Sequence, residues 1–336
     1  MWVVLIICLL LSLVIIVCLG TGSGVVYPEI IPAEGLTSVH AYNFDFPFAG
    51  GSQRISTEVG DAVYLGAKNA NKYAVLHGKQ PEDELLSGYY QAFISDPCQG
   101  PMYESLLRDF RDIRADEGLD DDEYLELITV FVQSLPYLEN ENATGMRFPV
   151  ETIVEGGGDC DEKACLLLGL LSREGYNVSL LFFSGNYHVA AGVAVPGQDG
   201  YAYIETTKYS FVGVPARMLA NGAILNTEPV VIKIGNGTEN YQSSDEGRFL
   251  DETVRSASDD ARILNTLIEL RKDDLSHYIP GSEDYVIRMA AFNQAVSDYD
   301  EKMRVFSYIS SHQYDRVGTY RWVQENEDSV YPLYHQ

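Results

Sequence analysis

Residues 156–171 read GGGDCDEKACLLLGLL, and they decide the fold of the middle of the chain. The three glycines predict a loop, and the apolar run after Cys160 predicts a buried helix that ends near Arg173. If Asp159 is the N-cap, Glu162 occupies the third helical position, which makes an Asp-x-x-Glu variant of the capping box. Cys160 is then the first helical residue, at the positive end of the helix.

Three β-rich runs follow this helix. SLLFF, YHVAAGVAV and YAYIETT are separated by turn residues in SGN and PGQDG. One helix packed on an antiparallel sheet predicts an α+β fold for residues 148–215.

The position of Cys160 has two opposing electrostatic consequences. Free N–H groups at a helix start stabilise a thiolate and lower its pKa, which is how a cysteine nucleophile is activated. Asp159, Asp161 and Glu162 lie within one turn of the sulfur, however, and like charges raise that pKa. A protonated histidine or a bound divalent cation would offset them.

His188 is the candidate partner of this thiol. It is one of six histidines and lies in a run that predicts a core strand. Ala190, Gly192 and Ala194 share its face of that strand, and we expect these small residues to leave room for the helix that carries Cys160 and for a substrate.

Glu205, in YIETT on the next strand, could orient the imidazole of His188. The simplest register across the five-residue loop pairs Val195 with Tyr201, which pairs Ala191 with Glu205 and puts Glu205 on the face opposite His188. A shift of one residue or a bulge would bring the two onto one face.

The charge balance excludes one class of partner. The 336-residue chain has 49 acidic and 23 basic side chains, for a net charge of −26. Nucleic acid is therefore not an expected partner, because no basic surface would neutralise its phosphates. The acids are scattered along the chain, which is typical of a soluble exterior surface.

The first nineteen residues, MWVVLIICLLLSLVIIVCL, contain no charged side chain and are long enough to cross a bilayer as a helix. They lack the basic start and the cleavage site of a signal peptide, so we predict an uncleaved single-pass anchor over residues 1–20. The bulk of the chain is then extracytoplasmic at the cell membrane. Three glycosylation sequons are compatible with that location, at Asn142, Asn177 and Asn236.

The rest of the chain predicts three further regions. Residues 21–110 contain a β-hairpin in VHAYNFDF and RISTEV, then charged helical segments over 82–95 and from 103 onward. Residues 111–235 form the core.

Residues 236–336 predict an antiparallel pair of helices. The strong apolar seam of this region consists of Tyr285, Met289, Phe292, Val296, Tyr299, Met303 and Phe306. A weaker seam precedes it and consists of Val254, Ala257, Ala261, Leu264 and Ile268. We expect the strong seam to pack on the rest of the chain rather than to dimerise.

Three cysteines follow the apolar segment: Cys98, Cys160 and Cys165. Cys160 and Cys165 are five residues apart on one helix, so their side chains diverge, which argues against a mutual disulfide. A bridge between Cys98 and Cys165 stays open. The same divergence argues against a zinc site made of Cys160, Cys165 and His188.

Four segments together resemble the transglutaminase-like superfamily: FVQSLPY (131–137), FPVETIVEGGGDCDEKACLLLGLL (148–171), GYNVSLLFFSGNYHVAAGV (175–193) and YIETT (203–207). They are similar to archaeal membrane-anchored members and to bacterial transglutaminase-like cysteine proteinases. The resemblance implies a papain/transglutaminase-like core with Cys160 as nucleophile, His188 as general base and acid, and Glu205 as the orienting carboxylate. The family usually has aspartate at this third place.

The resemblance also implies two further roles. Gln133 is a weak candidate for the donor that stabilises an oxyanion. Some related proteinases bind calcium beside the active cysteine, and Asp159, Asp161 and Glu162 match the acidic positions there. Capping of the helix is the competing explanation for these acids.

Two functional hypotheses follow. The first is a membrane-anchored thiol enzyme that acts on a peptide or protein substrate, with hydrolysis favoured over transfer to an amine. The second is a non-catalytic surface module that keeps the fold and serves in adhesion or assembly. The intact Cys160 and His188 favour the enzyme, and the sequence does not specify an oligomeric state.

Overall fold

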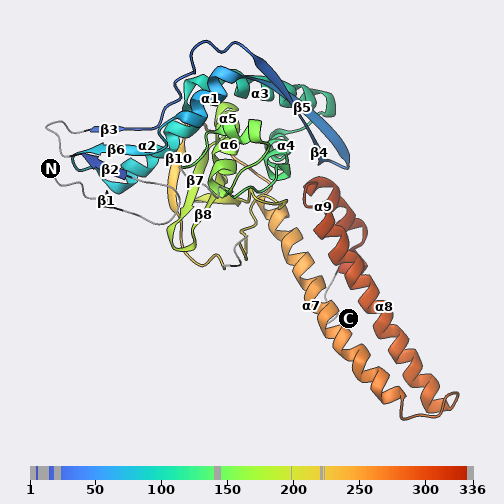
Figure 1. Ribbon diagram of the computed structural model, residues 1–336. Helices are drawn as coiled ribbons and strands as arrows, with labels where there is room; N and C mark the ends of the chain where they lie inside the picture. The colour runs from blue at the N-terminus through green and yellow to red at the C-terminus, as the bar shows by residue number, and fades with distance from the viewer. Residues whose placement is uncertain are drawn as a thin grey trace. The chain divides into compact units, whose positions relative to one another are not determined.

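The computed structural model describes residues 5–6, 15–18, 24–139, 145–197, 199–219, 222 and 224–330. The chain divides into two compact units, Met1–Ser244 and Asp245–Gln336 (Figure 1). The first unit mixes helices with small, mainly antiparallel sheets, and the second is helical in its described residues. The prediction of an α+β fold is therefore confirmed at this level.

The central sheet of the first unit has four antiparallel strands in the order β10-β7-β8-β9. Their bounds are Val178–Phe183 for β7, His188–Ala194 for β8, Tyr201–Ile204 for β9 and Val230–Ile234 for β10. Helix α6, Cys160–Arg173, packs against β8 and β7. The predicted helix and the three predicted β-rich runs are thus all present.

Helix α6 begins with the predicted capping box. The Asp159 side chain accepts from the Glu162 N–H at 3.3 Å, and the Glu162 side chain accepts from the Asp159 N–H at 3.1 Å. Every residue from Cys160 to Leu171 is buried, because other elements pack around the whole helix.

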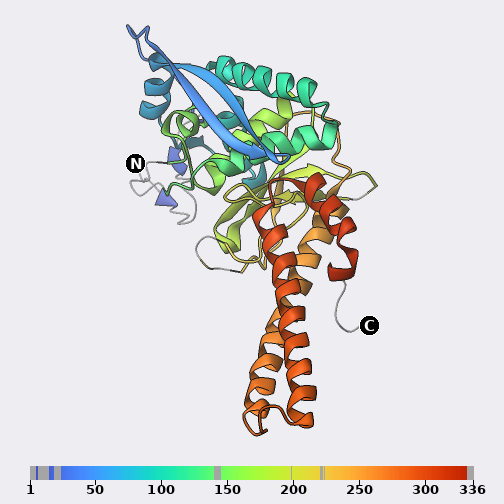
Figure 2. The same cartoon turned by 90° about the vertical axis from the view of Figure 1, so that its right-hand side faces the viewer.

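The predicted hairpin consists of β4, Val39–Phe48, and β5, Gly51–Gly60 (Figure 2). Its two turn residues, Ala49 and Gly50, have φ values of 48° and 72°. Positive φ at both positions matches the twist of the flanking strands and makes the short connection possible.

The hairpin packs on two helices of the same unit through aromatic rings. Phe46 of β4 lies 6.5 Å from Phe110 and 5.6 Å from Phe131, between ring centroids. Phe110 and Phe131 lie on α3, Gly100–Glu117, and α4, Asp121–Ser134. The expected regions 21–110 and 111–235 therefore share one core.

The remaining described elements of the first unit are α1 (Asp61–Asn69), β6 (Ala74–His77), α2 (Glu82–Ser95), a 3-10 turn η1 (Pro97–Gln99), α5 (Pro149–Glu155) and η2 (Ser184–Asn186). The helical region that was expected to run on from residue 103 is divided into α3 and α4. Gly118 ends α3 in the left-handed conformation, at φ 68°.

Residues 1–20 were predicted to form a membrane helix, but the six of them that the structure describes are in strands. Leu5–Ile6 and Ile15–Cys18 are strands β1 and β2, which join β6 and β3, Gly24–Val26, in a small sheet. Valine and isoleucine suit strands well, and a continuous apolar run cannot by itself distinguish a strand from a helix. The other residues of 1–20 lie outside the described residues. Among the helices described, none is both long enough and apolar enough to cross a bilayer.

The second unit contains the predicted helical pair. Its helices are α7 (Ser244–Leu275), α8 (Glu283–Ser311), α9 (Arg316–Glu325) and α10 (Glu327–Val330). On α7 the predicted seam is confirmed at Ala257, Ala261 and Leu264, which are all buried.

The seam predicted for α8 is displaced. The predicted residues are only half-buried, and the buried residues of this helix are Ala295, Lys302, Val305 and Ile309. Lys302 pairs with Asp260 of α7 at 3.5 Å and donates to the Ser329 carbonyl at 3.1 Å, so polar contacts occupy part of the helix interface.

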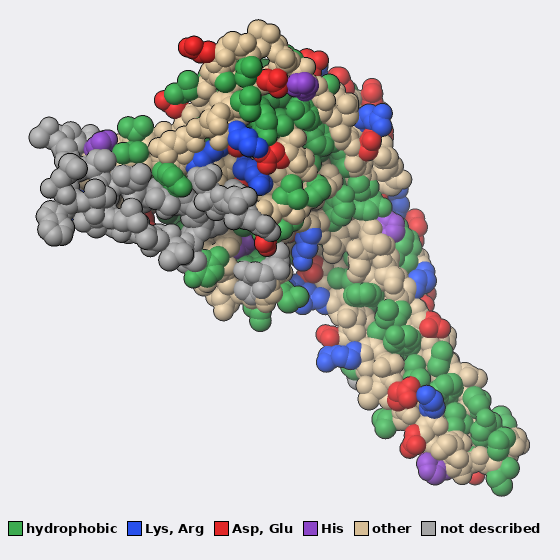
Figure 3. All heavy atoms as spheres, viewed as in Figure 1, with side chains coloured by type: hydrophobic (Ala, Val, Ile, Leu, Met, Phe, Trp, Pro, Cys, Tyr) green, Lys and Arg blue, Asp and Glu red, His purple; other side chains and the backbone are tan. Residues whose placement is uncertain are grey.

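Apolar side chains remain exposed at the end where α7 and α8 connect (Figure 3). They are Leu270, Ile279, Val286 and Ile287, which are between 58% and 78% exposed.

Candidate active site

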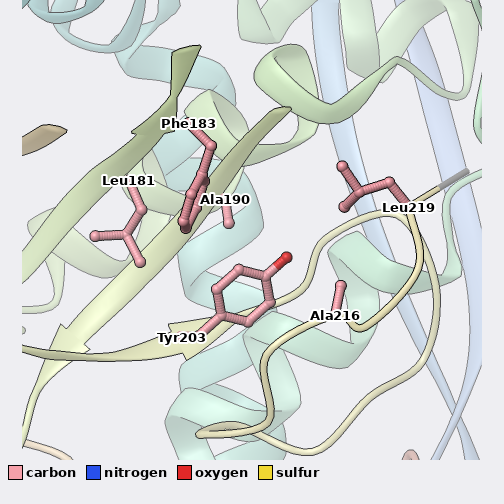
Figure 4. Close-up of a cluster of buried hydrophobic side chains, with 6 residues drawn as sticks. All are labelled: Leu181, Phe183, Ala190, Tyr203, Ala216 and Leu219. Atoms are coloured by element: carbon pink, nitrogen blue, oxygen red, sulfur yellow. The ribbon is translucent and has the colours of Figure 1, made fainter. Parts of the chain in front are cut away.

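The two faces of strand β8 pack against different parts of the chain. On the face of His188, a buried cluster comprises Leu181, Phe183, Ala190, Tyr203, Ala216 and Leu219 (Figure 4). The alternate residues of β8 are fully buried on the other face: Val189, Ala191 and Val193. On that other face Phe182 contacts Tyr90 of α2, a helix that packs against α6. The expectation that small residues on the His188 face make room for α6 is therefore wrong, because the segment after β9 fills that face.

The register of β9 brings Glu205 and His188 to the same face. Ala191 pairs with Ile204, so Glu205 follows one position beyond the last pair and aligns with Ala190. The observed register differs by one residue from the simplest one, and this shift puts Glu205 on the face of His188. Tyr203 pairs with Gly192 and lies on that face as well.

Cys160 lies where β8 and β9 separate. Helix α6, which begins with this residue, packs against β8, the strand that begins with His188. The Thr206 hydroxyl donates to the Cys160 carbonyl at 3.5 Å. Strand β9 ends at Ile204, two residues before Thr206.

A hydrogen-bonded chain joins His188 to Glu205 through a third side chain. The Nε2 of His188 lies 2.8 Å from the Tyr203 hydroxyl, and this hydroxyl donates to Glu205 Oε2 at 2.9 Å. The direct distance from His188 Nε2 to Glu205 Oε2 is 4.0 Å, which is too long for a hydrogen bond. The hydroxyl of Tyr203 therefore bridges the two.

The other oxygen of Glu205 is fixed by the two residues after it. Its Oε1 accepts from the N–H groups of Thr206 and Thr207 at 2.9 and 2.8 Å, and from the Thr207 hydroxyl at 2.7 Å. Burial alone would raise the pKa of Glu205, but these donors and the neighbouring His188 and Tyr203 hold that pKa below its usual value. Glu205 is thus a buried carboxylate that stays ionised.

Cys160 and His188 are both neutral in this environment. Burial, followed by the charges of Asp161 and Asp159, raises the pKa of the Cys160 thiol well above its ordinary value, and the N–H of Val189 only partly offsets this. Burial also lowers the pKa of His188, against the effect of Glu205. Among the described residues, no hydrogen bond joins the sulfur to the His188 ring. At neutral pH these two shifts favour a protonated thiol and a neutral imidazole.

Gln133 binds backbone rather than facing the sulfur. Its amide nitrogen donates to the carbonyls of Glu205 and Ser210 at 2.8 and 3.0 Å, and its oxygen accepts from the Ser210 N–H at 3.5 Å. Both amide hydrogens are used in this way, so the side chain positions the segment after β9 instead of offering a donor to an oxyanion.

The three acids beside Cys160 already have roles within the fold. Glu162 accepts from the backbone and the guanidinium of Arg147, both at 3.0 Å, and Asp159 is occupied as the helix cap. Asp161 is fully buried, and burial together with Asp159 raises its pKa, which disfavours a dianionic pair. In the described parts of the chain, no His, Cys, Asp or Glu side chains gather in a group of three that could hold a metal ion.

Lys163 is a buried cation that the sequence analysis missed. Its ammonium group donates to the carbonyls of Leu135 at 2.6 Å and Gln133 at 3.4 Å, at the end of α4. Burial lowers its pKa to about 8, and Glu205 acts in the opposite direction. A lysine directly before the apolar run of residues 164–171 was the signal that could have revealed it.

The three cysteines Cys98, Cys160 and Cys165 are all free thiols. Cys165 is fully buried on α6, and its sulfur lies 3.9 Å from that of Met146. The bridge between Cys98 and Cys165 that the sequence left open is not formed.

Comparisons of this chain with family models, with curated proteins and with solved structures find no match. The functional argument therefore depends on the geometry of Cys160, His188, Tyr203 and Glu205.

Proposed function

We propose that this chain is a membrane-anchored, extracytoplasmic thiol enzyme with a papain/transglutaminase-like core. It forms an acyl-enzyme on Cys160 from a peptide or protein amide, and water then releases the acid, as in a cysteine peptidase or amidase. One observation carries the proposal: α6, which begins with Cys160, packs against the strand that begins with His188, and that histidine is linked by hydrogen bonds to a buried carboxylate.

The reaction would proceed by general base catalysis from the neutral pair. His188 takes the thiol proton as the Cys160 sulfur attacks the amide carbonyl, so a carbon–sulfur bond forms while the carbonyl oxygen becomes negative. The carbon–nitrogen bond then breaks, and the imidazolium returns the proton to the leaving amine. Water, deprotonated by His188, attacks the thioester, and the acid leaves with the thiol restored.

The negative oxygen requires donors, and the start of α6 offers them. The first N–H groups of a helix have no partner within it and carry a partial positive charge. The capping box occupies the Glu162 N–H, so the N–H groups of Cys160 and Asp161 are the helix donors nearest the sulfur. Donors aimed at a developing oxyanion commonly supply the largest electrostatic term.

Alkylation of Cys160 as a function of pH tests this proposal. The full chain in detergent is treated with iodoacetamide from pH 4 to 10, and modification is mapped by mass spectrometry in wild type and His188→Ala. We expect the wild-type rate to rise as His188 loses its proton, below pH 6.5, and the variant to react roughly tenfold or more slowly at pH 7. Cys165, on the same helix, is the internal control for unfolding.

A chromogenic acyl ester adds a test of turnover. An acyl adduct on Cys160 that forms and then decays in water supports hydrolysis, whereas decay only with an added primary amine makes the protein an acyl transferase. Equal alkylation of wild type and His188→Ala, or no adduct on Cys160, would contradict the proposed enzyme.

The second candidate function, a non-catalytic surface module, is favoured by one observation. Cys160 is 8% exposed and His188 is 4% exposed, and the acids beside the thiol raise its pKa. If the site is purely structural, Cys160 should resist alkylation from pH 4 to 10 in both wild type and His188→Ala.

The membrane anchor remains part of the proposal and is carried by the uncharged residues 1–19. If the anchor is present, the full chain should resist alkaline carbonate extraction from membranes. Replacing Val14 and Ile15 with lysine should abolish that resistance. Extraction of the wild-type chain by carbonate would contradict the anchor. Of the three sequons, Asn142 lies outside the described residues.

A further inference from the structure

We infer that Tyr203 is a positioning residue that sets the tautomer of His188. Its hydroxyl, held between Glu205 and His188, keeps the imidazole proton on Nε2 and leaves Nδ1 as the nitrogen that accepts a proton. This inference rests on the proposed function for its catalytic meaning, although the tautomer itself can be measured independently.

The direction of each hydrogen bond follows from counting protons. Glu205 is ionised, so both of its oxygens only accept. The single proton of the Tyr203 hydroxyl is therefore donated to Oε2 of Glu205, at 2.9 Å. The oxygen of Tyr203 then has only lone pairs to offer to His188 Nε2, at 2.8 Å. Nε2 must carry the hydrogen, which leaves the lone pair of a neutral ring on Nδ1.

The chain of contacts is rigid enough to enforce this choice. Three donors from Thr206 and Thr207 fix Oε1 of Glu205, so the carboxylate cannot rotate to bind His188 directly. The Tyr203 ring lies between strand neighbours, with its centroid 6.2 Å from that of Phe183 and 6.4 Å from that of His188. Burial raises the pKa of Tyr203, so the hydroxyl stays protonated.

The same chain would stabilise the imidazolium during reaction. When Nδ1 takes the thiol proton, the Nε2–H already donates to an oxygen that is polarised by the Glu205 carboxylate. The positive charge is then balanced across one hydroxyl without movement of the carboxylate. Glutamate in place of the aspartate usual in the transglutaminase-like family is thus combined here with an interposed tyrosine.

Nitrogen-15 NMR of the full chain, labelled at histidine and kept in detergent, measures the tautomer directly. Protonated and unprotonated ring nitrogens have well-separated shifts, and His188→Gln identifies the signal of this residue among six histidines. We expect wild type to show Nε2 protonated and Nδ1 unprotonated at pH 7. Tyr203→Phe, which removes only the hydroxyl, should give a mixture of the two tautomers.

Tyr201→Phe is the matched control. Tyr201 lies two residues earlier on the same face of β9, and its hydroxyl contacts Asn177 at 3.3 Å rather than His188. This variant should keep the wild-type tautomer. A wild-type ring protonated on Nδ1, or a Tyr203→Phe ring that remains wholly protonated on Nε2, would overturn the inference.

The rate of Cys160 alkylation separates failure of this inference from failure of the proposed enzyme. If the tautomer changes as expected and Tyr203→Phe slows alkylation roughly tenfold at pH 7, both stand. If the tautomer changes while Cys160 is inert in every variant, Tyr203 positions His188 but the enzyme proposal fails. If the tautomer is unaffected while His188→Ala still slows alkylation, the enzyme stands and the inference about Tyr203 falls.

Discussion

Replacing Lys163 with methionine should make the stability of the first unit less dependent on pH. Lys163 is fully buried, and its pKa is lowered by burial from 10.5 to about 8, with Glu205 opposing the shift. Between these two values the unfolded chain binds more protons than the folded chain, so stability rises with pH. At 1.36 kcal/mol per pKa unit, the buried charge costs about 3 kcal/mol at pH 7 and about 1.4 kcal/mol at pH 9.5. Wild type should therefore gain about 2 kcal/mol relative to the variant over this range.

Urea unfolding read by pulse proteolysis measures this difference, because fragments of the first unit can be followed separately. Tryptophan fluorescence would not serve, since Trp322 lies in the second unit and Trp2 lies outside the described residues. Lys208→Met, at an exposed lysine, is the matched control and should keep the wild-type pH dependence. If Lys163→Met shows the same rise in stability as wild type from pH 7 to 9.5, the assignment of a destabilised buried charge is incorrect.

Three further substitutions test the surroundings of the site. Gln133→Leu leaves two buried backbone carbonyls without their donor and should cost about 1–3 kcal/mol in urea unfolding, and a loss below about 0.5 kcal/mol would contradict its positioning role. A Cβ at position 169 would clash with the Tyr103 hydroxyl, so Gly169→Ala should destabilise the first unit by about 1–3 kcal/mol. The urea midpoint should fall in this variant, whereas Tyr103→Phe should not lower it. Asp159→Asn keeps the helix cap but removes a charge that raises the pKa of Cys160. Alkylation of Cys160 at pH 7 should therefore become faster while the free energy of unfolding is unchanged. Asp159→Ala removes the cap as well and should lower the free energy of unfolding by about 1 kcal/mol.

The elements that the sequence predicts well are those with local signals. The capping box and the apolar run fix both ends of α6, and the positive-φ turn residues of Ala49 and Gly50 fix the hairpin. Each of these depends on contacts within a few residues of the chain. That is why Cys160 could be placed at the first helical position from the sequence alone.

Features that depend on register could not be predicted in the same way. A shift of one residue between β8 and β9 moves Glu205 from one face of the sheet to the other, and no residue of the connecting loop specifies it. Tyr203 lies two residues before Glu205 and therefore on the same face. Its position beside His188 could be recognised only from the observed pairing of Gly192 with Tyr203. Tertiary packing likewise decided which side of β8 the helix α6 covers.

Two predictions based on apolar content differ from the structure for a related reason: the helical form of the described residues 5–6 and 15–18, and the seam of α8. Apolar content gives the tendency to be buried but not the partner, so a Val- and Ile-rich run suits a strand as well as a helix. On α8, the pairing of Lys302 with Asp260 places a charged residue in the interface, and a seam drawn only through large apolar side chains misses it.

The site differs from the expected pattern of a thiol enzyme in two ways, and neighbouring residues account for both. The carboxylate is a glutamate, and its separation of 4.0 Å from His188 matches the insertion of one hydroxyl, that of Tyr203. The thiol is surrounded by acids, and this favours a neutral thiol and imidazole at rest rather than a preformed ion pair. In the proposed enzyme the proton would move only during attack, so the tautomer of His188 would matter more than the resting pKa of Cys160. A neutral pair can serve as a catalyst only if the lone pair of the imidazole already lies on the correct nitrogen, which is the condition that Tyr203 and Glu205 together would meet.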